Sequence, residues 1–412
     1  MSGAKPQTAG PVRPGAGFDI GCRPVSHHQP ERLQPAVPGH GRGAVRASLY
    51  QSERLDDAVS KAELGQQTAG AVPGRGQCAP GAGRADGGAV GPAGGRHSHR
   101  FPNFDQTVGP GAYLWWYVDA ISDDGQHALS IIAFVGSVFS PYYSSAFKSQ
   151  GAAVQAANHC AINVALYSPG QRRWTMTERG RSSVERSADH LRIGPSQLAW
   201  RGDHLEIDLN EISVPVPQRV RGTVRVYPDA LCSYSNALDD AGRHRWGPIA
   251  PCARVKVELA KPGLRWQGNA YFDSNEGDEP IARPFKTWDW TRACMADGST
   301  AVIYDVTQLS GARTLLAERF KPDGSWESFE PAPKRSALPG TRWRIDRGVR
   351  ADAASATQVI ATLEDTPFYA RSLLQTHLLG ERVTAVHETL EPQRLKSRAV
   401  QMMLPFRMPR RA

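Results

Sequence analysis

The sequence predicts an all-β protein in which two antiparallel barrels follow a long region without regular structure. Three observations lead to this prediction. From Tyr113 onward, short apolar or alternating runs are separated by turn sequences, Asp-Gly pairs lie between such runs, and an aromatic motif of the first half returns in the second half. Alternation with period two is typical of half-buried strands, and Asp-Gly between such runs is a strong hairpin signal.

The first 102 residues differ in composition from the rest. Of the 40 glycines and 31 prolines in the chain, residues 1–100 hold 19 and 10, and their only aromatic residues are Phe18 and Tyr50. A segment so poor in large apolar side chains cannot offset its ordering entropy by burial, so we expect residues 1–102 to be disordered. Alternatively, the region is not a biological domain, because GC-rich DNA read in an unintended frame or from too early a start gives the same bias.

The expected strands begin with Tyr113–Ile121 and end with Gln401–Phe406. Asp-Gly pairs at positions 124–125, 297–298 and 323–324 each separate two of these runs. Two-residue turns of this kind join neighbouring antiparallel strands. We therefore expect antiparallel pairing throughout the folded part.

An internal repeat indicates two similar halves. The motif WWY at 115–117 and the motif WDW at 288–290 are each followed by one of the Asp-Gly pairs, at a constant offset of 173 residues. About eight strands in each half would suit a closed up-and-down barrel, which has no edge strand and can enclose one apolar ligand. We expect these barrels at residues 103–260 and 261–412, with a single large sandwich as the alternative.

Composition and cysteine spacing exclude several classes of protein. The formal charge is +9, of which the first 100 residues carry +5, and no stripe of Lys and Arg interleaved with aromatic rings follows. We therefore expect no nucleic-acid partner. The six cysteines are scattered without CxxC pairs or zinc spacing, so we expect no metal site and a reduced, cytoplasmic setting.

The chain has no apolar run of about 18 residues and no leader-like segment, so a substrate from the lipid phase would be met at the membrane surface. The C-terminal sequence MMLPFRMPRRA mixes Met and Phe with Arg. Such a segment could contact an anionic membrane. A final strand with a frayed basic end is the favoured interpretation.

One segment, residues 266–292, concentrates acidic and aromatic side chains. It holds the carboxylates Asp273, Glu276, Asp278, Glu279 and Asp289 among the rings of Trp266, Tyr271, Phe272, Phe285, Trp288 and Trp290. A carboxyl group held against apolar rings has its charged form disfavoured, so its pKa rises and it remains a proton donor near neutral pH. The π-faces of such rings can also stabilise a cation. This combination predicts protonation of an apolar substrate.

Five motifs in this order resemble the carotenoid 1,2-hydratase (hydroxyneurosporene synthase) family of phototrophic bacteria. They are GPGAYLWWYVDAISDDG at 109–125, FSPYY at 139–143, HRWGP at 244–248, GNAYFDSNEGDEP at 268–280 and WDWTR at 288–292. The resemblance covers about residues 103–412 and leaves residues 1–102 looking foreign to the family. It implies tandem lipocalin-like barrels and a redox-cofactor-independent hydro-lyase acting on acyclic carotenoids such as neurosporene and lycopene. It also implies a cytoplasmic enzyme peripheral to the inner or photosynthetic membrane, and the oligomeric state stays open.

Four residues are the candidates for this chemistry. Asp273 would protonate C2 of the terminal double bond, and Tyr271, two residues earlier on an extended segment, would share its face. The resemblance places His244 and Trp246 beside this acid. His244 would orient or reprotonate Asp273 or accept a proton from water, while Trp246 and Tyr271 would cover the C1 cation.

Each candidate also has a structural interpretation. Asp273 could cap the turn that follows it, His244 could be a solvated loop residue, and Trp246 and Tyr271 could be core aromatics. Asp289 is expected at the surface or paired with Arg292. The competing functions are a lipocalin-like carrier that binds carotenoid or lipid unchanged and a glycoside hydrolase with paired carboxylates.

Overall fold

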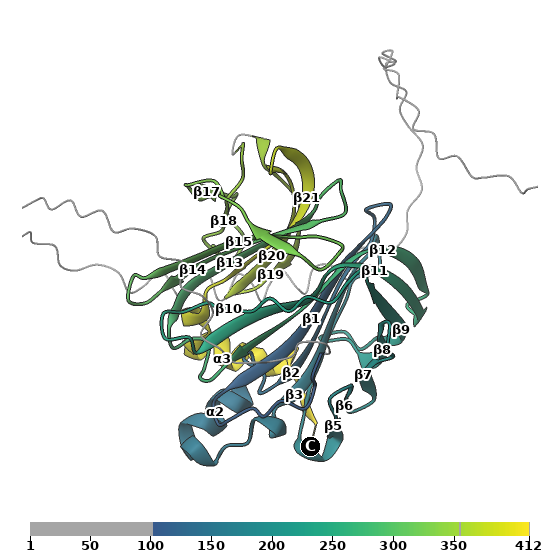
Figure 1. Cartoon of the computed structure of the whole chain (residues 1–412). Coiled ribbons are helices and arrows are strands. Elements are labelled where there is room, and N and C mark those ends of the chain that lie inside the picture. The colour runs from purple at the N-terminus through teal and green to yellow at the C-terminus, as the bar shows by residue number, and fades with distance from the viewer. Residues whose placement is uncertain (1–101, 354–355, 412) are drawn as a thin grey trace, which may run out of the picture. The chain divides into compact units, whose positions relative to one another are not determined.

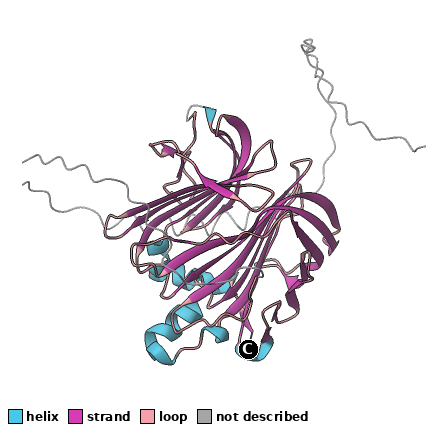
Figure 2. Ribbon diagram, in the orientation of Figure 1, coloured by secondary structure: helices cyan, strands magenta, loops and turns pink. Residues whose placement is uncertain are grey.

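The computed structural model describes residues 102–353 and 356–411, and most of their regular structure is β-strand (Figures 1 and 2). The prediction of an all-β protein is therefore confirmed in part: the described residues form a mostly β protein that also contains two α-helices. The expected disorder of residues 1–102 lies, apart from Pro102, outside the described residues.

The larger sheet has 13 strands and curls into a half-barrel (Figure 1). Its order is β22-β4-β3-β2-β1-β12-β11-β9-β8-β7-β6-β5, with β10 paired to β11. The strands are β1 (Tyr113–Ser122), β2 (Ala128–Val135), β3 (Cys160–Tyr167), β4 (Arg173–Arg179), β5 (Val184–Arg186), β6 (His190–Ile193), β7 (Ser196–Trp200), β8 (Leu205–Ile212), β9 (Arg219–Pro228), β10 (Asn236–Ala237), β11 (His244–Lys261), β12 (Leu264–Gly277) and β22 (Arg410–Arg411). In the described part of the chain, all strand pairings are antiparallel except the parallel pairing of β22 with β4.

The second sheet has seven strands in the order β16-β15-β14-β13-β21-β20-β19, and β17 pairs with β18 separately. These strands are β13 (Phe285–Cys294), β14 (Thr300–Gln308), β15 (Arg313–Phe320), β16 (Trp326–Ser328), β17 (Ser336–Ala337), β18 (Gly348–Val349), β19 (Gln358–Asp365), β20 (Tyr369–Leu378) and β21 (Glu381–Leu390).

The arrangement of the sheets differs from the two closed barrels that we expected. In the described part of the chain, no pairing joins β5 to β22 or β16 to β19, so both sheets are open. The strand β12 lies beyond residue 260 but pairs with β11 and β1 of the larger sheet. Alternation identifies strands but not their partners, so the sequence did not reveal that the β11–β12 hairpin belongs wholly to the first sheet.

The predicted hairpins and the predicted repeat both appear in the structure. Each of the three Asp-Gly turns joins neighbouring strands, with a positive φ at its glycine. The strands β1 and β13, which carry the repeated motif, also face each other. Trp115 lies 6.4 Å from Trp288, and Tyr117 lies 5.5 Å from Trp290, measured between ring centroids. Residues at the offset of 173 therefore meet across the interface between the sheets.

Two ten-residue helices, α2 (Pro141–Gln150) and α3 (Arg398–Arg407), lie at one end of the described unit (Figure 1). The short 3-10 helices are η1 (Gly151–Ala153), η2 (Ala156–Asn158), η3 (Arg181–Ser183) and η5 (Pro392–Lys396). The run 401–406, expected as a strand, is part of α3. The buried residues of this helix, Val400 and Leu404, are four positions apart, which is helical spacing. Within the described residues, no helix combines the length and apolar character needed to cross a bilayer.

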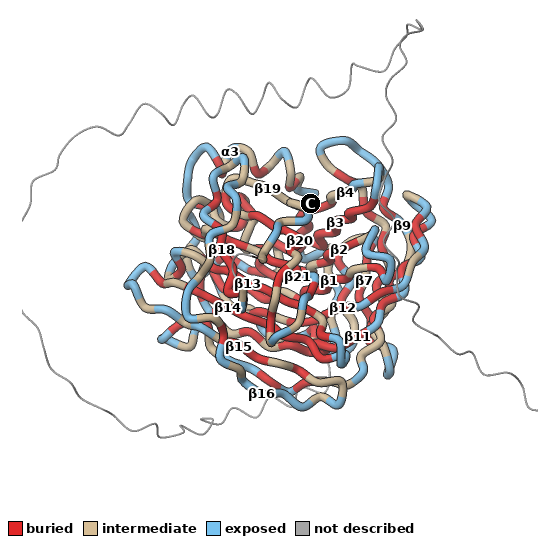
Figure 3. Tube along the Cα trace, turned by 90° about the horizontal axis from the view of Figure 1, so that it is seen from above, coloured by how far each residue is buried: buried red, intermediate tan, exposed pale blue. Residues whose placement is uncertain are grey.

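Buried residues lie on both faces of the larger sheet (Figure 3). One cluster fills the curl of the larger sheet, and a second, rich in rings, lies between the sheets. The second cluster includes Tyr113, Tyr117, Trp246, Tyr271 and Tyr304. The strands that carry these residues are therefore covered on both faces.

A buried ion cluster joins the two sheets. Asp119 of β1 lies 3.0 Å from Nε of Arg292 on β13 and 3.3 Å from Nη2 of Arg371 on β20. Arg371 also bonds to Oε1 of Glu388 at 2.6 Å and donates to the Tyr117 hydroxyl at 2.6 Å. All five side chains are largely or fully buried, so each charge depends on its partners.

We predict that Arg371→Met lowers the free energy of unfolding by about 3–5 kcal/mol, because it leaves the buried Glu388 without its ion-pair partner and Asp119 with Arg292 alone. Urea denaturation at pH 7 measures this loss. The control is Arg265→Met, at a side chain that is 83% exposed, where we expect a change within about 0.5 kcal/mol. Equal effects of the two substitutions would contradict the prediction.

Candidate active site

Asp273 lies in the middle of β12, the strand flanked by β1 and β11. It faces the second sheet and is 2% exposed. Tyr271 shares its face, as the strand period requires, and donates a hydrogen bond from its hydroxyl to Oδ2 of Asp273 at 2.8 Å. The acid and its neighbouring phenol are therefore side by side, as predicted.

Trp246 of β11 also contacts the acid. Its indole Nε1 donates to Oδ2 of Asp273 at 2.9 Å and lies 3.1 Å from the Tyr271 hydroxyl. Both donors thus converge on one carboxyl oxygen. The other oxygen, Oδ1, is buried and has no hydrogen-bond partner among the described residues.

Burial raises the pKa of Asp273 to about 8, because the charged form loses its hydration. The two hydrogen bonds from Tyr271 and Trp246 lower this pKa, and the charges of Asp119 and Glu388 raise it further. Desolvation is the largest effect, so the carboxyl is mostly protonated at neutral pH. Because Oδ2 already accepts two hydrogen bonds, the proton of the carboxyl group lies on Oδ1. This oxygen is therefore the one that can donate the proton.

Aromatic rings surround this acid. Tyr304 of β14 packs against Trp246 at 4.8 Å between centroids, and Trp290 of β13 packs against Tyr271 at 5.5 Å. Tyr117 of β1, opposite Asp273 in register, lies edge-on to Tyr271 at 6.4 Å. A cation formed beside Asp273 would face several electron-rich surfaces.

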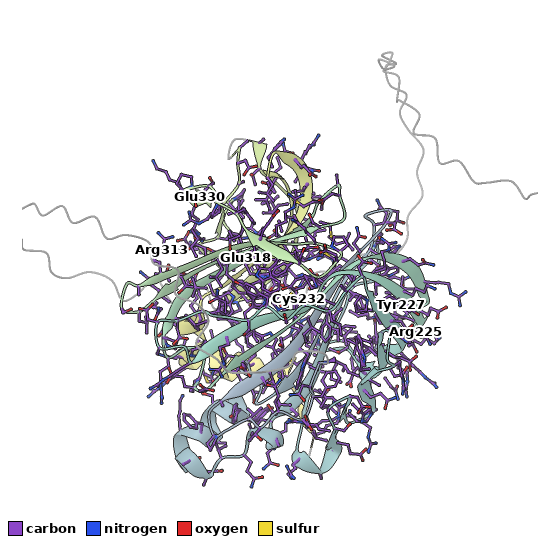
Figure 4. The ribbon with its side chains drawn as sticks, in the orientation of Figure 1. Arg225, Tyr227, Cys232, Arg313, Glu318 and Glu330 are labelled. Carbon is purple, nitrogen blue, oxygen red and sulfur yellow. The ribbon has the colours of Figure 1, made fainter. Side chains whose placement is uncertain are left out.

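The loop between β9 and β11 closes one side of the rings around Trp246. It carries Cys232, which lies between the two sheets near Glu318 of β15 (Figure 4). Tyr234 of this loop packs edge-on against Trp246 at 5.4 Å and donates to Oε1 of Glu318 at 3.1 Å. By contrast, Arg225 lies on β9 of the larger sheet and pairs with Glu258 of β11.

His244 lies apart from the acid. It is opposite Gly277, four residues from Asp273 along β12, or about 13 Å at the strand rise. Its Nδ1 is 2.8 Å from the Tyr113 hydroxyl, and its Nε2 has no hydrogen-bond partner among the described residues, with Glu279 Oε1 at 3.8 Å. The expectation that His244 directly adjoins Asp273 is therefore wrong, although both face the second sheet.

The environment of His244 keeps its ring neutral. The side chain is fully buried and packs edge-on against Phe285 at 4.8 Å. Burial lowers the pKa of His244, while the charges of Asp239 and Glu279 oppose this shift. The solvated-loop interpretation of His244 does not fit these contacts.

Several residues around the acid were not predicted from the sequence. Tyr304 and Asn275, whose side chains lie 3.4 Å apart, extend the polar and aromatic lining, and Tyr117 links it to the ion cluster. Tyr304 stands in an apolar strand run with no motif of its own. Only the pairing of the sheets brings it to Trp246. The repeat offset could have suggested that Asp119 meets Arg292, because these positions differ by 173 residues.

The remaining carboxylates of the segment are held by arginines. Glu276 and Asp278 pair with Arg245, and Glu279 pairs with Arg243 and Arg283. These side chains are structural rather than part of the aromatic chamber.

Asp289 does not pair with Arg292, because these two residues point to opposite faces of β13. It is buried and pairs with Arg335 at 2.7 Å. Burial raises the pKa of Asp289 to about 7, against the charge of Arg335. Among the residues that the structure describes, no three His, Cys, Asp or Glu side chains gather as a metal-binding group.

A buried acid with an unbonded oxygen, set among aromatic rings between two β-sheets, defines this molecule as a β-sheet protein with an enclosed acidic and aromatic site. The family described as "Carotenoid hydratase CrtC" matches residues 131–412. The chain belongs to this family.

Named relatives agree with this assignment. The acyclic carotenoid 1,2-hydratase of Rubrivivax gelatinosus is 55% identical over 96% of this chain and 99% of its own length. The enzyme of the same name from Thiocapsa roseopersicina is 51% identical over 98% of this chain and 99% of its own. That of Cereibacter sphaeroides is 37% identical over 68% of this chain and 98% of its own.

The first two matches bear on the N-terminal region. Alignments that cover 96% and 98% of the chain leave out far fewer residues than residues 1–102 contain, so they extend into that region. The expectation that residues 1–102 look foreign to the family is therefore wrong.

We predict that Asp273→Asn changes how stability depends on pH. The pKa of Asp273 is about 8 in the folded protein and about 4 when unfolded, so between these values unfolding releases a proton and the unfolding free energy of the wild type falls as pH rises. Asn cannot ionise. The unfolding free energy of the variant, relative to that of the wild type, should therefore rise by up to about 1.4 kcal/mol per pH unit from pH 5 to 8. Urea denaturation measures this difference. A difference that is constant with pH would contradict the raised pKa.

Proposed function

We propose that this enzyme is an acyclic carotenoid 1,2-hydratase, which adds water across the terminal double bond of carotenoids such as neurosporene and lycopene. The protein is a member of a carotenoid hydratase family, and relatives that match nearly its whole length carry this activity in their names. The observation that carries the mechanism is the unbonded, buried Oδ1 of Asp273, on a carboxyl whose pKa is raised to about 8.

In the proposed reaction, the π electrons of the C1–C2 double bond take the proton from Oδ1 of Asp273 and form a C2–H bond. The electron deficit remains at C1 as a tertiary cation. Water then forms a C1–O bond with a lone pair, and the resulting oxonium loses one proton. That proton returns to Asp273, so the acid is regenerated and no redox cofactor takes part.

The rings supply the second part of the mechanism. Trp246 and Tyr271 hold Oδ2 by hydrogen bonds and stand beside the place where the cation forms. A cation over a ring face gains roughly 0.5–2 kcal/mol, and about 1.4 kcal/mol corresponds to a tenfold change in rate. Two such rings can therefore change the rate by up to about a hundredfold without moving a proton.

We assign His244 to proton transfer at a distance from the acid. Its neutral ring has one nitrogen without a hydrogen bond, so it can take up the oxonium proton and return it to Asp273 through a chain of water molecules, which regenerates the acid. The separation from Asp273 of about 13 Å along the strand excludes direct exchange between the two groups.

We also propose that the two sheets correspond to two lipocalin-like halves and that the protein works in the cytoplasm at the membrane surface. The repeat of β1 and β13 supports the first part, because in each sheet this strand pairs with the next strand in sequence and with a later one, β12 or β21. A polyene substrate dissolves in lipid, which supports the second part.

A carrier that binds the pigment unchanged is the competing function. A carrier gains nothing from a buried acid whose ionisation is suppressed, because burial of an unpaired carboxyl costs stability. The Asp273 site therefore favours the enzyme. The arginine-paired acids leave no second carboxylate free for glycoside hydrolysis beside Asp273, within the described residues.

We predict that purified protein given lycopene in detergent and deuterated water yields a mono-hydroxylated product with deuterium at C2, seen by mass spectrometry and NMR. Asp273→Asn keeps the shape but removes the proton, so the rate should fall by roughly 10²–10⁴-fold. The wild-type rate should decline as pH rises through about 8, the pKa of Asp273. Unchanged pigment from the wild type would favour the carrier, and an active Asp273→Asn variant would end the assignment of the acid.

Two substitutions of Trp246 separate its roles. Trp246→Phe keeps a ring but loses the donor to Asp273 Oδ2, so we expect a moderate loss of rate together with a higher pKa in the pH profile. Trp246→Leu loses the ring as well, and its rate should fall about tenfold further. Initial rates from pH 6 to 9.5 measure both effects. Equal rates for the Phe and Leu variants would mean that the ring only packs.

A further inference from the structure

A cavity of about 390 Å³ opens at the end of the described unit that carries the two helices. It lies between α2, the segment 280–283 and the η5–α3 region. Its walls are mostly apolar, with Val138, Phe147, Ile281 and Leu395 among them, and three cations, Lys148, Arg283 and Lys396, also line it. An apolar interior bordered by positive charge suits an apolar ligand that comes from an anionic surface.

The inner wall of this cavity reaches the aromatic cluster between the sheets. Tyr113 lines the cavity and is bonded through its hydroxyl to His244. From there the rings follow one another towards the acid: His244 to Phe285, Phe285 to Trp288, Trp288 to Tyr304 and Tyr304 to Trp246, with centroids 4.8–5.6 Å apart. The cavity and the Asp273 site are therefore connected by continuous aromatic packing.

The helix α3, beside the cavity, presents large apolar side chains to solvent. Met402 is 69% exposed and Phe406 is 77% exposed, the highest values among large hydrophobic residues in the described part of the chain. They are four residues apart, so they lie on one side of the helix, and Arg398 precedes them by another four. The opposite side packs Val400 and Leu404 into the protein.

The helix is held in this orientation by the chain that follows it. The strand β22 pairs with β4, and Arg410 bonds to the buried Glu178, which also contacts His159. Buried polar contacts of the following residues thus hold Met402 and Phe406 in their outward position.

The C-terminal segment at this end contains no acidic residue, although Arg394, Arg407 and Arg410 pair with glutamates outside the segment. Residues 392–412 contain six Lys and Arg and no Asp or Glu, and α2 has Lys148 as its only charged residue. Neither Lys148 nor Arg398 has an ion pair within the described residues, and Lys396 bonds only to the Gln393 side chain. These cations remain available to phosphate groups of lipids.

We propose that this end of the molecule docks on an anionic lipid bilayer, with Met402 and Phe406 in the headgroup region and Lys148, Lys396 and Arg398 against lipid phosphates. The cavity then takes the end of a polyene from the bilayer. Its volume is near the low end of ligand pockets, about 300–1,000 Å³, so a long polyene extends beyond it into the lipid. The docking stands on these surface features, whereas the identity of the ligand rests on the proposed function.

Vesicle co-sedimentation of the full chain tests the docking. Wild type should bind vesicles of phosphatidylcholine with phosphatidylglycerol and bind pure phosphatidylcholine weakly. The double variant Met402→Ser/Phe406→Ser should lose at least about tenfold in partitioning. Its matched control is Val216→Ser/Ile360→Ser, at side chains 63% and 53% exposed elsewhere on the surface, which should bind as wild type.

Neutralising the cations tests the charge contribution. Lys148→Gln, Lys396→Gln and Arg398→Gln should each weaken binding to the anionic vesicles about fivefold, with little change on neutral vesicles. Equal binding by these variants and the wild type, or wild-type binding that ignores phosphatidylglycerol, would overturn the proposal. The proposal would also be overturned if the wild type self-associated in the absence of vesicles and the double variant did not. A second copy of the chain would then cover the surface.

The cavity is tested by filling it. Ser144 lines the cavity, whereas its neighbour Ser145 on α2 is exposed and does not. Ser144→Trp should slow hydration of lycopene in anionic vesicles at least tenfold while vesicle binding stays unchanged, and Ser145→Trp should leave both unchanged. Equal rates for the two variants would overturn the role of the cavity. If the wild type binds vesicles as expected but does not hydrate lycopene, the proposed function is refuted and the docking proposal remains.

Discussion

The contact between Asp119 and the guanidinium groups of Arg292 and Arg371 fixes how the two sheets meet. These charges are buried, and an ion pair in the interior is stable only when its geometry matches closely. A shift of one sheet along the other would separate them and leave each unpaired. The cluster therefore sets the register at which the rings of β1, β11 and β12 meet those of β13 and β14, and so builds the aromatic chamber.

This cluster also sets the electrostatics of the site. The charges of Asp119 and Glu388 add to the burial that raises the pKa of Asp273, while the two arginines balance them within the cluster. Among the residues that the structure describes, none forms an ion pair with Asp273. An arginine bonded to Asp273 would stabilise its charged form and abolish its use as a donor. Two types of buried carboxylate thus lie close together: those of the cluster are paired with arginines, and that of Asp273 is without an ion pair.

The sequence predicted the parts of the site that depend on neighbours in the chain. The pairing of Tyr271 with Asp273 follows from strand alternation, and the turns follow from Asp-Gly chemistry. Predictions that needed distant partners were less accurate. The place of β12 in the first sheet, the contact of Tyr304 with Trp246 and the distance of His244 from the acid all depend on which strands pair, and on the shifts in register along β11. The alternation of apolar and polar residues carries no information on strand pairing or on shifts in register.

The helix α3 shows a second limit of sequence patterns. Its run of Met, Leu and Phe was compatible with a strand, because short apolar stretches do not distinguish the two periods. Its helical form depends on the cover that the β-sheets offer to Val400 and Leu404.

The pairing of β1 with β12 has a consequence for how the chain acquires its structure. Tyr113 is bonded in register opposite Gly277, so the middle of the larger sheet joins segments that are far apart in sequence. Contacts of such long separation form slowly, because the intervening loop must be closed first. During synthesis, β1 to β4 can assemble early, but one edge of β1 stays without a partner until β12 has left the ribosome. An open, apolar strand edge of this kind is prone to aggregation, so a newly made chain has to be shielded over that interval.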